Sequence, residues 1–274
     1  MRLAIFARTF VRESMEAALD AVAAHNLDAA QFNPSLLGGS SLPESLAGAD
    51  ADRVAAAHAE RGIAMVAVSG TYNMAHPDAA RRADGARRLA RLIAIAPRLR
   101  TGVVTLCTGT RDPGDMWRAH PGNASPDAWG DMRASVAAAV DAAERAGVVV
   151  AIEPEPGNVI RDARAARRLL DEIASPALRI VLDAANLVAP DPGADQTRVI
   201  GEALEQLAAD IVLAHAKDVR ADGTVVAAGR GAVDYPGYVA GLRAAGFDGP
   251  LVLHGLAEDE VAASVAFVRA ALTA

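Results

Sequence analysis

The sequence has a single cysteine, Cys107, among its 274 residues, so the chain cannot form an internal disulfide. One unpaired thiol is typical of a protein from a reducing compartment. No run of roughly 18 apolar residues occurs, so we expect no transmembrane helix. Near the N-terminus, Arg2, Arg8 and Arg12 interrupt the hydrophobic segment that a signal peptide needs. We therefore expect a soluble, cytoplasmic protein with no membrane partner.

Basic residues are in deficit as well. The chain has 27 Lys and Arg residues against 34 Asp and Glu residues, which gives a formal net charge of −7. Nucleic-acid-binding proteins usually carry a basic stripe, so this balance argues against a nucleic-acid partner. The excess acid is interpreted as a solvated surface. Only one of the 27 basic residues is a lysine, Lys217.

Several common catalytic motifs are missing. The chain has no nucleophile elbow around a serine, no phosphate-binding P-loop and no paired cysteines for a zinc site. No G-x-G-x-x-G motif follows the first strand-like segment, which weakens a dinucleotide-binding open sheet as the fold.

What the chain does contain is a regular alternation of strand-like and helix-like segments. Ala/Leu/Arg-rich segments with helical spacing include 51–62, 86–96, 134–147 and 163–174. Near-continuous apolar strands covered by helices indicate a parallel sheet, and eight such units favour a closed barrel. The sequence predicts a single (β/α)8 TIM-barrel domain over residues 1–274, with a doubly wound open sheet as the alternative. The expected strands span 2–8, 27–32, 63–70, 102–109, 148–154, 178–185, 211–218 and 250–255.

One connection is much longer than the others. Residues 108–126 read TGTRDPGDMWRAHPGNASP, rich in Gly, Pro and polar residues. Loops of this length without secondary structure are usually active-site lids or disordered segments. The presence of Arg111, Trp117 and His120 favours a lid whose side chains bind substrate, with a floppy insertion as the alternative.

Four successive strand-like segments end in a side chain that can bind a metal: Glu153, Asp183, His215 and His254. In a parallel barrel the C-terminal ends of the strands form the mouth, where catalytic residues gather. A divalent cation needs several O and N ligands that converge on one point, and neighbouring strand ends supply them. We expect these four residues to hold Mn, Mg, Co or Zn. Taken singly, a strand-end Asp is more often a helix cap.

The remaining histidines divide into two groups. His76 and His120 fall outside the helix-like segments and are expected at the barrel mouth. His25 and His58 lie in helical segments and are interpreted as surface residues.

Lys217 stands two residues after His215 on the same strand-like run. Residues two apart on a strand point the same way, so both side chains are expected to face the mouth. A lysine there can donate to substrate oxygens, stabilise oxyanion charge, or titrate as an acid or base when desolvated, which Arg cannot do. The alternative is a structural ion pair with Asp218 or another carboxylate.

Other polar residues near the expected mouth have two interpretations each. Glu155, two residues after Glu153, either completes an acid/base pair or is a solvated loop residue. Cys107 is interpreted as a small buried hydrophobe rather than a nucleophile. Substrate-binding candidates, with turn-forming roles as the alternative, are Asn73, His76, Asn158 and Asn186.

The chain resembles the xylose-isomerase-like TIM-barrel superfamily, the sugar phosphate isomerase/epimerase proteins. The resemblance covers nearly the whole chain and is carried by IEP, LDAAN and LAHAKD at three strand ends, and by the tail GRGAVDYPGYVAGLRAAGFDGPLVL. The stretches SGTYNMAHPD and LCTGTRDPGDMWRAHP are similar to one branch of that superfamily.

The resemblance implies that Glu153, Asp183 and His215 match three metal ligands of the ketose epimerases of the family. Those enzymes use a Glu as the fourth ligand, and here His254 occupies that position. They also have a His where this chain has Asn186. Lys217 fits the family's His-x-Lys-Asp pattern, which contacts substrate oxygens. The departure at His254 puts the family's two-glutamate proton exchange in doubt.

The expected function is a metal-dependent isomerase or epimerase that forms an enediolate from a small sugar, a sugar phosphate or a related hydroxy-carbonyl compound. Glu153 is the expected base, with His254 or Glu155 as its partner and Lys217 stabilising the oxyanion. Alternatives are a metal-dependent dehydratase of a keto-sugar or inositol derivative, a sugar-binding barrel without catalysis, and an endonuclease-IV-like phosphodiesterase. A homo-oligomeric state is left open.

Overall fold

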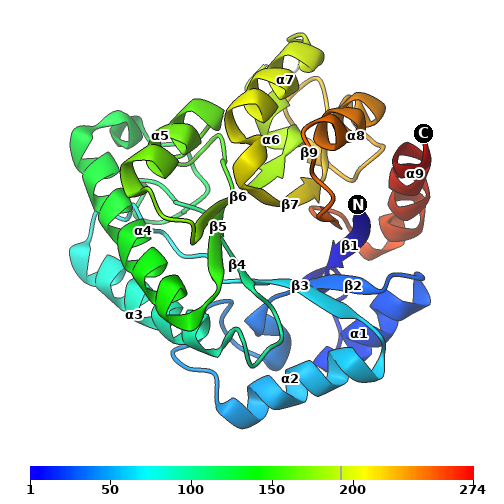
Figure 1. The fold of residues 1–274 in the computed structure, drawn as a ribbon, viewed down its shortest axis with the longest axis horizontal. Helices are drawn as coiled ribbons and strands as arrows, with labels where there is room; N and C mark the ends of the chain where they lie inside the picture. Colours follow the sequence, from blue (N-terminus) through cyan, green and yellow to red (C-terminus); the bar gives the residue numbers. More distant parts are fainter. Residues whose placement is uncertain (192) are drawn as a thin grey trace.

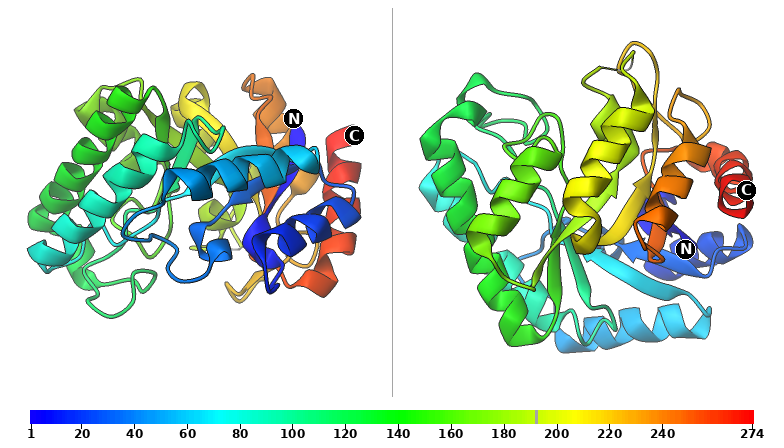
Figure 2. Two further views of the ribbon diagram at one scale, coloured as in Figure 1. Left: turned by 90° about the horizontal axis from the view of Figure 1, so that it is seen from below. Right: turned by 45° about the horizontal axis from the view of Figure 1, so that its top comes forward.

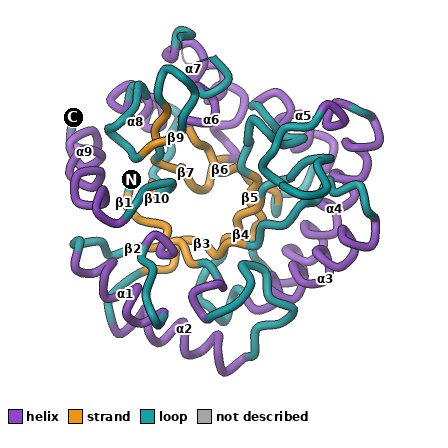
Figure 3. Tube along the Cα trace, turned by 180° about the vertical axis from the view of Figure 1, so that it is seen from behind, coloured by secondary structure: helices purple, strands orange, loops and turns teal. Residues whose placement is uncertain are grey.

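The computed structural model describes residues 1–191 and 193–274. Parallel strands close into a barrel in the order β1-β10-β7-β6-β5-β4-β3-β2, and the helices surround it (Figures 1 and 3). The chain therefore folds as a TIM barrel, as the alternation of segments predicts. The barrel strands are β1 (Arg2–Phe6), β2 (Ala29–Phe32), β3 (Ala64–Ser69), β4 (Val103–Leu106), β5 (Val149–Ile152), β6 (Leu178–Asp183), β7 (Ile211–Ala216) and β10 (Pro250–Leu253).

The helices lie outside the strands and shield them from solvent (Figure 2). Each of the four helix-like segments predicted from the sequence falls in a helix, α2 to α5. None of the described helices is long and apolar enough to cross a bilayer. The helices are α1 (Met15–Ala24), α2 (Gly48–Glu60), α3 (Ala79–Ile95), α4 (Pro126–Ala146), α5 (Ala163–Ile173), α6 (Ala184–Val188), α7 (Gln196–Leu207), α8 (Tyr235–Ala244) and α9 (Val261–Thr273).

Short polar residues and glycines set the ends of these helices. Ser125 accepts a hydrogen bond from the backbone N–H of Ala128 at 3.1 Å and so caps α4. At the other end of α4, Gly147 adopts a left-handed conformation with φ of 67°, which is the usual glycine C-cap. Asp162 caps α5 in the same way as Ser125 caps α4, through the N–H of Ala165.

A layer of small and apolar side chains fills the barrel interior. It forms a cluster separate from the larger core between the strands and the helices. Because side chains alternate between the two faces of a strand, the residue two positions further along each strand also faces the interior. This alternation decides which side chains meet at the C-terminal mouth. The interior layer includes Ala4, Phe6, Ala29, Ala67, Ala151, Val181, Leu213 and Val252.

A small hairpin follows the seventh barrel strand, which the sequence patterns did not indicate. Strands β8 (Asp218–Val219) and β9 (Val225–Val226) pair in antiparallel fashion. The Asp218 carboxylate holds this segment, because its Oδ1 accepts hydrogen bonds from the N–H groups of Val219 and Val233, each at 2.9 Å.

The interpretation of His58 as a surface residue is wrong. Its side chain lies on the inner face of α2 and is only 3% exposed. The ring packs edge-on against Phe32, and Nδ1 bonds to the carbonyl oxygen of Val54 at 2.9 Å. Helical spacing alone does not show which face of a helix a histidine occupies when most of its neighbours are alanines.

We expect His58 to make the fold sensitive to acid. Burial lowers its pKa from the ordinary 6.5, and the nearby Arg61 lowers it further. As pH falls through about 6.5, the unfolded chain takes up a proton at His58 and the folded chain does not, so stability falls. Between about pH 7.5 and about pH 5.5 this difference removes at most about 1.4 kcal/mol of unfolding free energy.

Urea unfolding of the wild type and of His58→Leu at these two pH values measures the effect. The unfolding free energy lost between the two pH values should be smaller in the variant. Because each protein is compared with itself, the effect of the substitution on packing cancels. His120→Gln, at an exposed loop position, is the control and should keep the wild-type pH dependence. Equal losses in the wild type and in His58→Leu would contradict this assignment.

Candidate functional site

Two residues further along the strands, toward their C-terminal ends, the side chains that face the barrel interior are polar. On β5, Ala151 is followed by Glu153, and on β7, Leu213 is followed by His215. All side chains of this polar layer except the buried Asp183 line the floor of a cavity of about 910 Å³ at the C-terminal mouth. The layer consists of Gln31, Ser69, Thr105, Glu153, Asp183, His215 and His254. The last four are the residues expected from the sequence, whereas the first three were not singled out.

Glu153 and His215 lie on this floor, and Asp183 lies buried beside them. Each offers a ligand atom, and the three atoms all lie within 4.8 Å of one another. His215 Nδ1 is 3.1 Å from Glu153 Oε1 and 3.9 Å from Asp183 Oδ2. All three side chains are buried. The fold thus brings together three of the four predicted metal ligands from β5, β6 and β7.

Asp183 serves two purposes with its two oxygens. Oδ1 accepts a hydrogen bond from the N–H of Ala185 at 2.9 Å and caps α6, which starts directly after β6. Oδ2 faces the cluster instead, 3.3 Å from Lys217 Nζ. The helix-cap and metal-ligand interpretations of Asp183 are therefore compatible.

The orientation of His215 is set by a neighbour from the far side of the barrel. His215 Nε2 lies 3.1 Å from Gln31 Oε1, and Gln31 Nε2 donates to Thr105 Oγ1 at 3.1 Å. This pairing turns Nδ1 toward Glu153. Burial lowers the pKa of His215, but the charges of Glu153 and Asp183 outweigh burial and raise it. Gln31 is the polar residue in the otherwise apolar AAQF strand, and that is the only sequence signal of its role.

His254 stands beside the cluster rather than within it. Its ring stacks on the His215 ring, with centroids 5.0 Å apart and planes inclined by 3°. Phe6 covers the opposite face of the ring at 5.3 Å. Burial, together with the charges of His215 and Lys217, lowers the pKa of His254 to about 3, so the imidazole is neutral. The expectation that His254 binds a metal stays a prediction.

Lys217 lies among the acidic side chains, on the same side of the chain as His215. Its Nζ is 3.3 Å from Asp183 Oδ2, 3.4 Å from Glu155 Oε1 and 3.8 Å from Glu153 Oε1. Burial favours the neutral amine, but the three carboxylates outweigh it and raise the pKa of Lys217. The ion pair that was the alternative role therefore forms with these carboxylates and not with Asp218.

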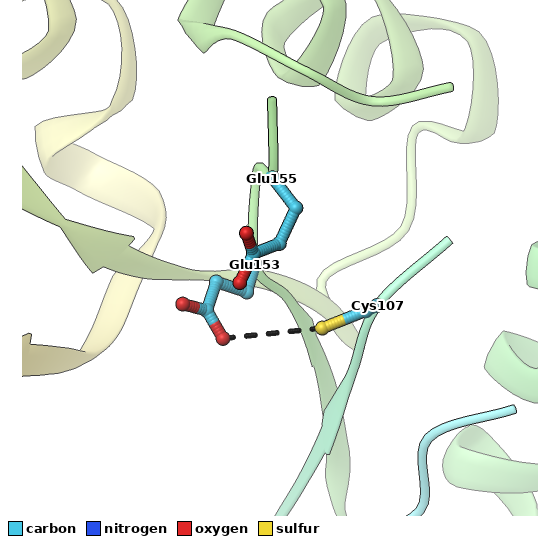
Figure 4. Close-up of side chains that lie close together, drawn as sticks. All are labelled: Cys107, Glu153 and Glu155. Carbon is cyan, nitrogen blue, oxygen red and sulfur yellow. Dashed lines mark hydrogen bonds between the residues drawn. The ribbon is translucent and has the colours of Figure 1, made fainter. Parts of the chain in front are cut away.

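The two glutamates that follow β5 have unlike electrostatic surroundings. Burial opposes ionisation of Glu153, but the charges of His215 and Lys217 outweigh it and lower its pKa. Burial and the charge of Glu153 raise the pKa of Glu155 to about 7. Figure 4 shows both side chains at the end of the strand, with Cys107 Sγ 3.9 Å from Glu153 Oε2. Glu153 is thus ionised at neutral pH, whereas Glu155 is only partly protonated there.

The three asparagines predicted to bind substrate make hydrogen bonds within the protein. Asn73 Oδ1 accepts from the N–H groups of Ala75 and Thr110. Asn158 donates from Nδ2 to the carbonyl oxygen of Met116 at 3.3 Å and so anchors the long loop. Asn186 is different, because its Nδ2 donates to Glu153 Oε1 at 3.0 Å and orients that carboxylate.

The long loop 108–126 places only part of its predicted side chains over the cavity. Trp117 lines the cavity and is 52% exposed. Arg111 and His120 line a second, separate hollow on the other side of the loop, where Arg111 pairs with Asp131 at 2.8 Å. His76 is buried, with Nδ1 accepting from the N–H of Asp78. These substrate-binding assignments stay predictions.

A divalent cation fits the cluster of Glu153, Asp183 and His215. Within the described part of the chain, Asp183 Oδ2 and His215 Nδ1 are buried and make no hydrogen bond. A lone pair on Nδ1 that faces a carboxylate oxygen is repelled unless a cation or a proton lies between them. Carboxylate oxygens and imidazole nitrogen are the donors that divalent transition metals and zinc accept. Lys217 shares Asp183 Oδ2 and supplies part of the required positive charge.

Comparison with known proteins gives the same fold. The sequence model of the xylose isomerase-like TIM barrel family matches residues 19–271. No curated protein matches the chain in sequence.

Solved structures resemble the chain over nearly its whole length. The apo form of 3-keto-D-glucoside 4-epimerase from E. coli is 17% identical, with a TM-score of 0.77, covering 98% of this chain and 99% of that chain. D-Psicose 3-epimerase from Clostridium cellulolyticum H10 is 15% identical, with a TM-score of 0.76 and 99% of each chain covered. The probable 3-DHS dehydratase from Bacillus anthracis is 14% identical, with a TM-score of 0.76, covering 98% of this chain and 99% of that chain. At such identities the likeness shows the fold alone.

Cys107 should react slowly with thiol reagents in the folded protein. Burial raises its pKa well above the ordinary value, and the charge of Glu153 raises it further. The thiolate is the reactive form, so modification by Ellman's reagent near neutral pH should be slower by roughly tenfold or more than in the urea-unfolded chain. Cys107→Ser should show no reaction, since the chain has no other cysteine. Equal rates in the folded and unfolded chains would refute the buried, protonated thiol.

Proposed function

Because the chain belongs to the xylose isomerase-like TIM barrel family, we propose that it is a metal-dependent isomerase or epimerase of a small sugar, a sugar phosphate or a related hydroxy-carbonyl compound. The observation that carries this proposal is the pair Glu153 and Glu155 on one wall of the cavity. Their unlike surroundings keep Glu153 ionised and leave Glu155 partly protonated near neutral pH. Such a pair can remove a proton from carbon and return one.

The other cavity-lining residues suit a small polyhydroxylated substrate. Hydroxyl and amide groups dominate the polar part of the wall, and they can both donate to and accept from sugar hydroxyls. Trp117 and Met116 reach the cavity from the long loop, and we propose that Trp117 packs against the bound substrate. The polar wall includes Gln31, Asn33, Ser41, Ser69, Thr71 and Thr105.

We propose that Glu153, Asp183 and His215 hold the divalent metal, with His254 as a candidate for a fourth ligand. His254 Nδ1 is buried and has no hydrogen-bond partner within the described residues, so it has a free nitrogen to offer. When bound, Mn, Mg, Co or Zn supplies Lewis-acid polarisation of the substrate carbonyl.

The residues of the chain then handle the protons. Glu153, ionised and oriented by Asn186, takes the proton from the carbon beside the carbonyl. Lys217, whose ammonium is fixed between the carboxylates, stabilises the negative charge that develops on the substrate oxygen. Glu155, which is partly protonated near neutral pH, returns a proton to the carbon. His254 stays neutral and takes no proton in this scheme.

Dehydration of a keto-sugar is the second candidate function. It begins with the same proton removal, and the proton on Glu155 would go to a departing hydroxyl group instead of to carbon. Loss of water from a substrate, rather than uptake of solvent deuterium with retention of all oxygens, would select this reaction.

Removal of the metal ligands gives the first test. Glu153→Gln and Asp183→Asn should lower the metal content of purified protein, measured by elemental analysis, because each loses a charged donor. With a ketose substrate in deuterated water, Glu153→Gln should also lower solvent exchange at carbon by roughly 10²- to 10⁴-fold. Asp127→Asn, on the outer surface of α4, is the matched control. A wild-type chain that binds no divalent metal contradicts the metal site, and binding of sugar without exchange indicates a non-catalytic barrel.

Lys217→Arg tests whether the lysine has a chemical role. The variant keeps the positive charge but places a larger, planar group in a site closed by three carboxylates. We expect it to fold and bind metal while turnover falls by roughly 10²-fold or more. Circular dichroism and metal analysis check the fold and the metal, and deuterium exchange checks turnover. If turnover is preserved, Lys217 is only a structural partner of the carboxylates.

A further inference from the structure

Two basic side chains stand near the cavity, and their surroundings differ sharply. Lys217 is buried and is surrounded by Glu153, Glu155 and Asp183. Arg8 directly follows β1, which β10 separates from β7, and it is exposed and lines the cavity. Within residues 1–191 and 193–274, no carboxylate pairs with Arg8, although most arginines of the outer surface have such a partner.

The acidic residue at the neighbouring rim of the cavity pairs with another arginine and not with Arg8. Glu258 also lines the cavity, and its two oxygens are taken by the two terminal nitrogens of Arg12. This bidentate pair neutralises the acidic charge at that edge. The free guanidinium of Arg8 therefore faces the cavity as an uncompensated cation.

Arg8 is also held in place by the cavity wall. Its guanidinium carbon lies 5.6 Å from the centroid of the Phe6 ring, within the range of a cation–π contact. Phe6 stacks in turn on His254, and His254 stacks on His215. A continuous row of planar groups thus runs from the Glu153, Asp183 and His215 cluster to Arg8.

We propose that the substrate carries an anionic group, a phosphate or a carboxylate, that binds Arg8 while its hydroxy-carbonyl end lies at Glu153. This inference names the substrate class of the proposed isomerase or epimerase and rests on that function. The guanidinium offers a planar pair of donors that match two oxygens of either anion.

The charge distribution of the cavity fixes the orientation of such a substrate. At the floor, the ammonium of Lys217 is already paired with Glu153, Glu155 and Asp183, so it is not free to pair with a substrate anion, whereas Arg8 is. The row of rings separates that floor from Arg8. An anion at Arg8 therefore leaves the neutral carbonyl end to enter the floor. A neutral sugar could accept hydrogen bonds from the guanidinium but would leave its charge unpaired.

Isothermal titration calorimetry with matched ligands tests the proposal. The neutral probes are D-fructose, D-tagatose, D-psicose and L-sorbose. Each of the first three is compared with its 6-phosphate, and L-sorbose is compared with 5-keto-D-gluconate, in which a carboxylate replaces the terminal hydroxymethyl group. The proteins are the wild type, Arg8→Gln, Arg8→Lys and the control Arg145→Gln, which removes the same charge from the exposed end of α4.

At least one anionic probe should bind the wild type more tightly than its neutral counterpart. Arg8→Gln should weaken that probe by roughly 10- to 100-fold and leave the neutral counterpart unchanged, because a hydrogen-bonded ion pair is lost. Arg8→Lys should recover part of the loss, and Arg145→Gln should behave as the wild type. If Arg8 strengthens the binding of a sugar 6-phosphate but not of 5-keto-D-gluconate, the substrate is a sugar phosphate. The reverse result identifies the substrate as a sugar acid.

Two other results would overturn the inference and can be told apart. If neutral probes bind as tightly as anionic ones, or if Arg8→Gln weakens both members of a pair equally, Arg8 does not select an anion although the sugar site stands. If none of the probes binds the wild type, the proposed sugar isomerase or epimerase function fails along with the inference that rests on it.

Discussion

The burial of one ammonium among three carboxylates is the interaction on which the rest of the site depends. Lys217 Nζ lies within 4 Å of an oxygen of Asp183, Glu153 and Glu155. In a medium less polar than water, three carboxylates this close cannot all ionise unless positive charge lies beside them. Lys217 and His215 supply that charge. Glu153 lies beside both of them, whereas Glu155 pairs with Lys217 alone. Glu153 is consequently ionised, whereas Glu155 is partly protonated near neutral pH.

The barrel gives this charge cluster its rigidity. The members of the cluster stand at or shortly after the ends of β5, β6 and β7, and three of them are fixed by a further contact. Asp183 caps α6 with one oxygen, Gln31 fixes His215, and Asn186 fixes Glu153. The charges of this cluster are compensated within it, whereas Arg8, beyond Phe6 and His254, remains as a separate positive charge on the cavity wall.

Much of the fold and part of the site could be predicted from the residues. Every expected strand overlaps a barrel strand, since β-branched runs between turn residues leave little choice of structure. Strand parity correctly placed Lys217 on the side of His215. His58 was misplaced because an alanine-rich helix gives no clear apolar face. Gln31 and Arg8 passed unnoticed, because nothing local distinguishes a cavity-lining Gln or Arg from a solvated one.

The sequence by itself determined the barrel and which side chains stand at the ends of its strands, because both follow from local periodicity. Only the tertiary structure decided which of those side chains touch. It set His254 beside the cluster as a stacked ring, left Arg111 and His120 in a separate hollow, and turned Arg8 toward the cavity without a partner. These outcomes depend on the closure of the barrel, which brings β1 beside β10 across the whole length of the chain.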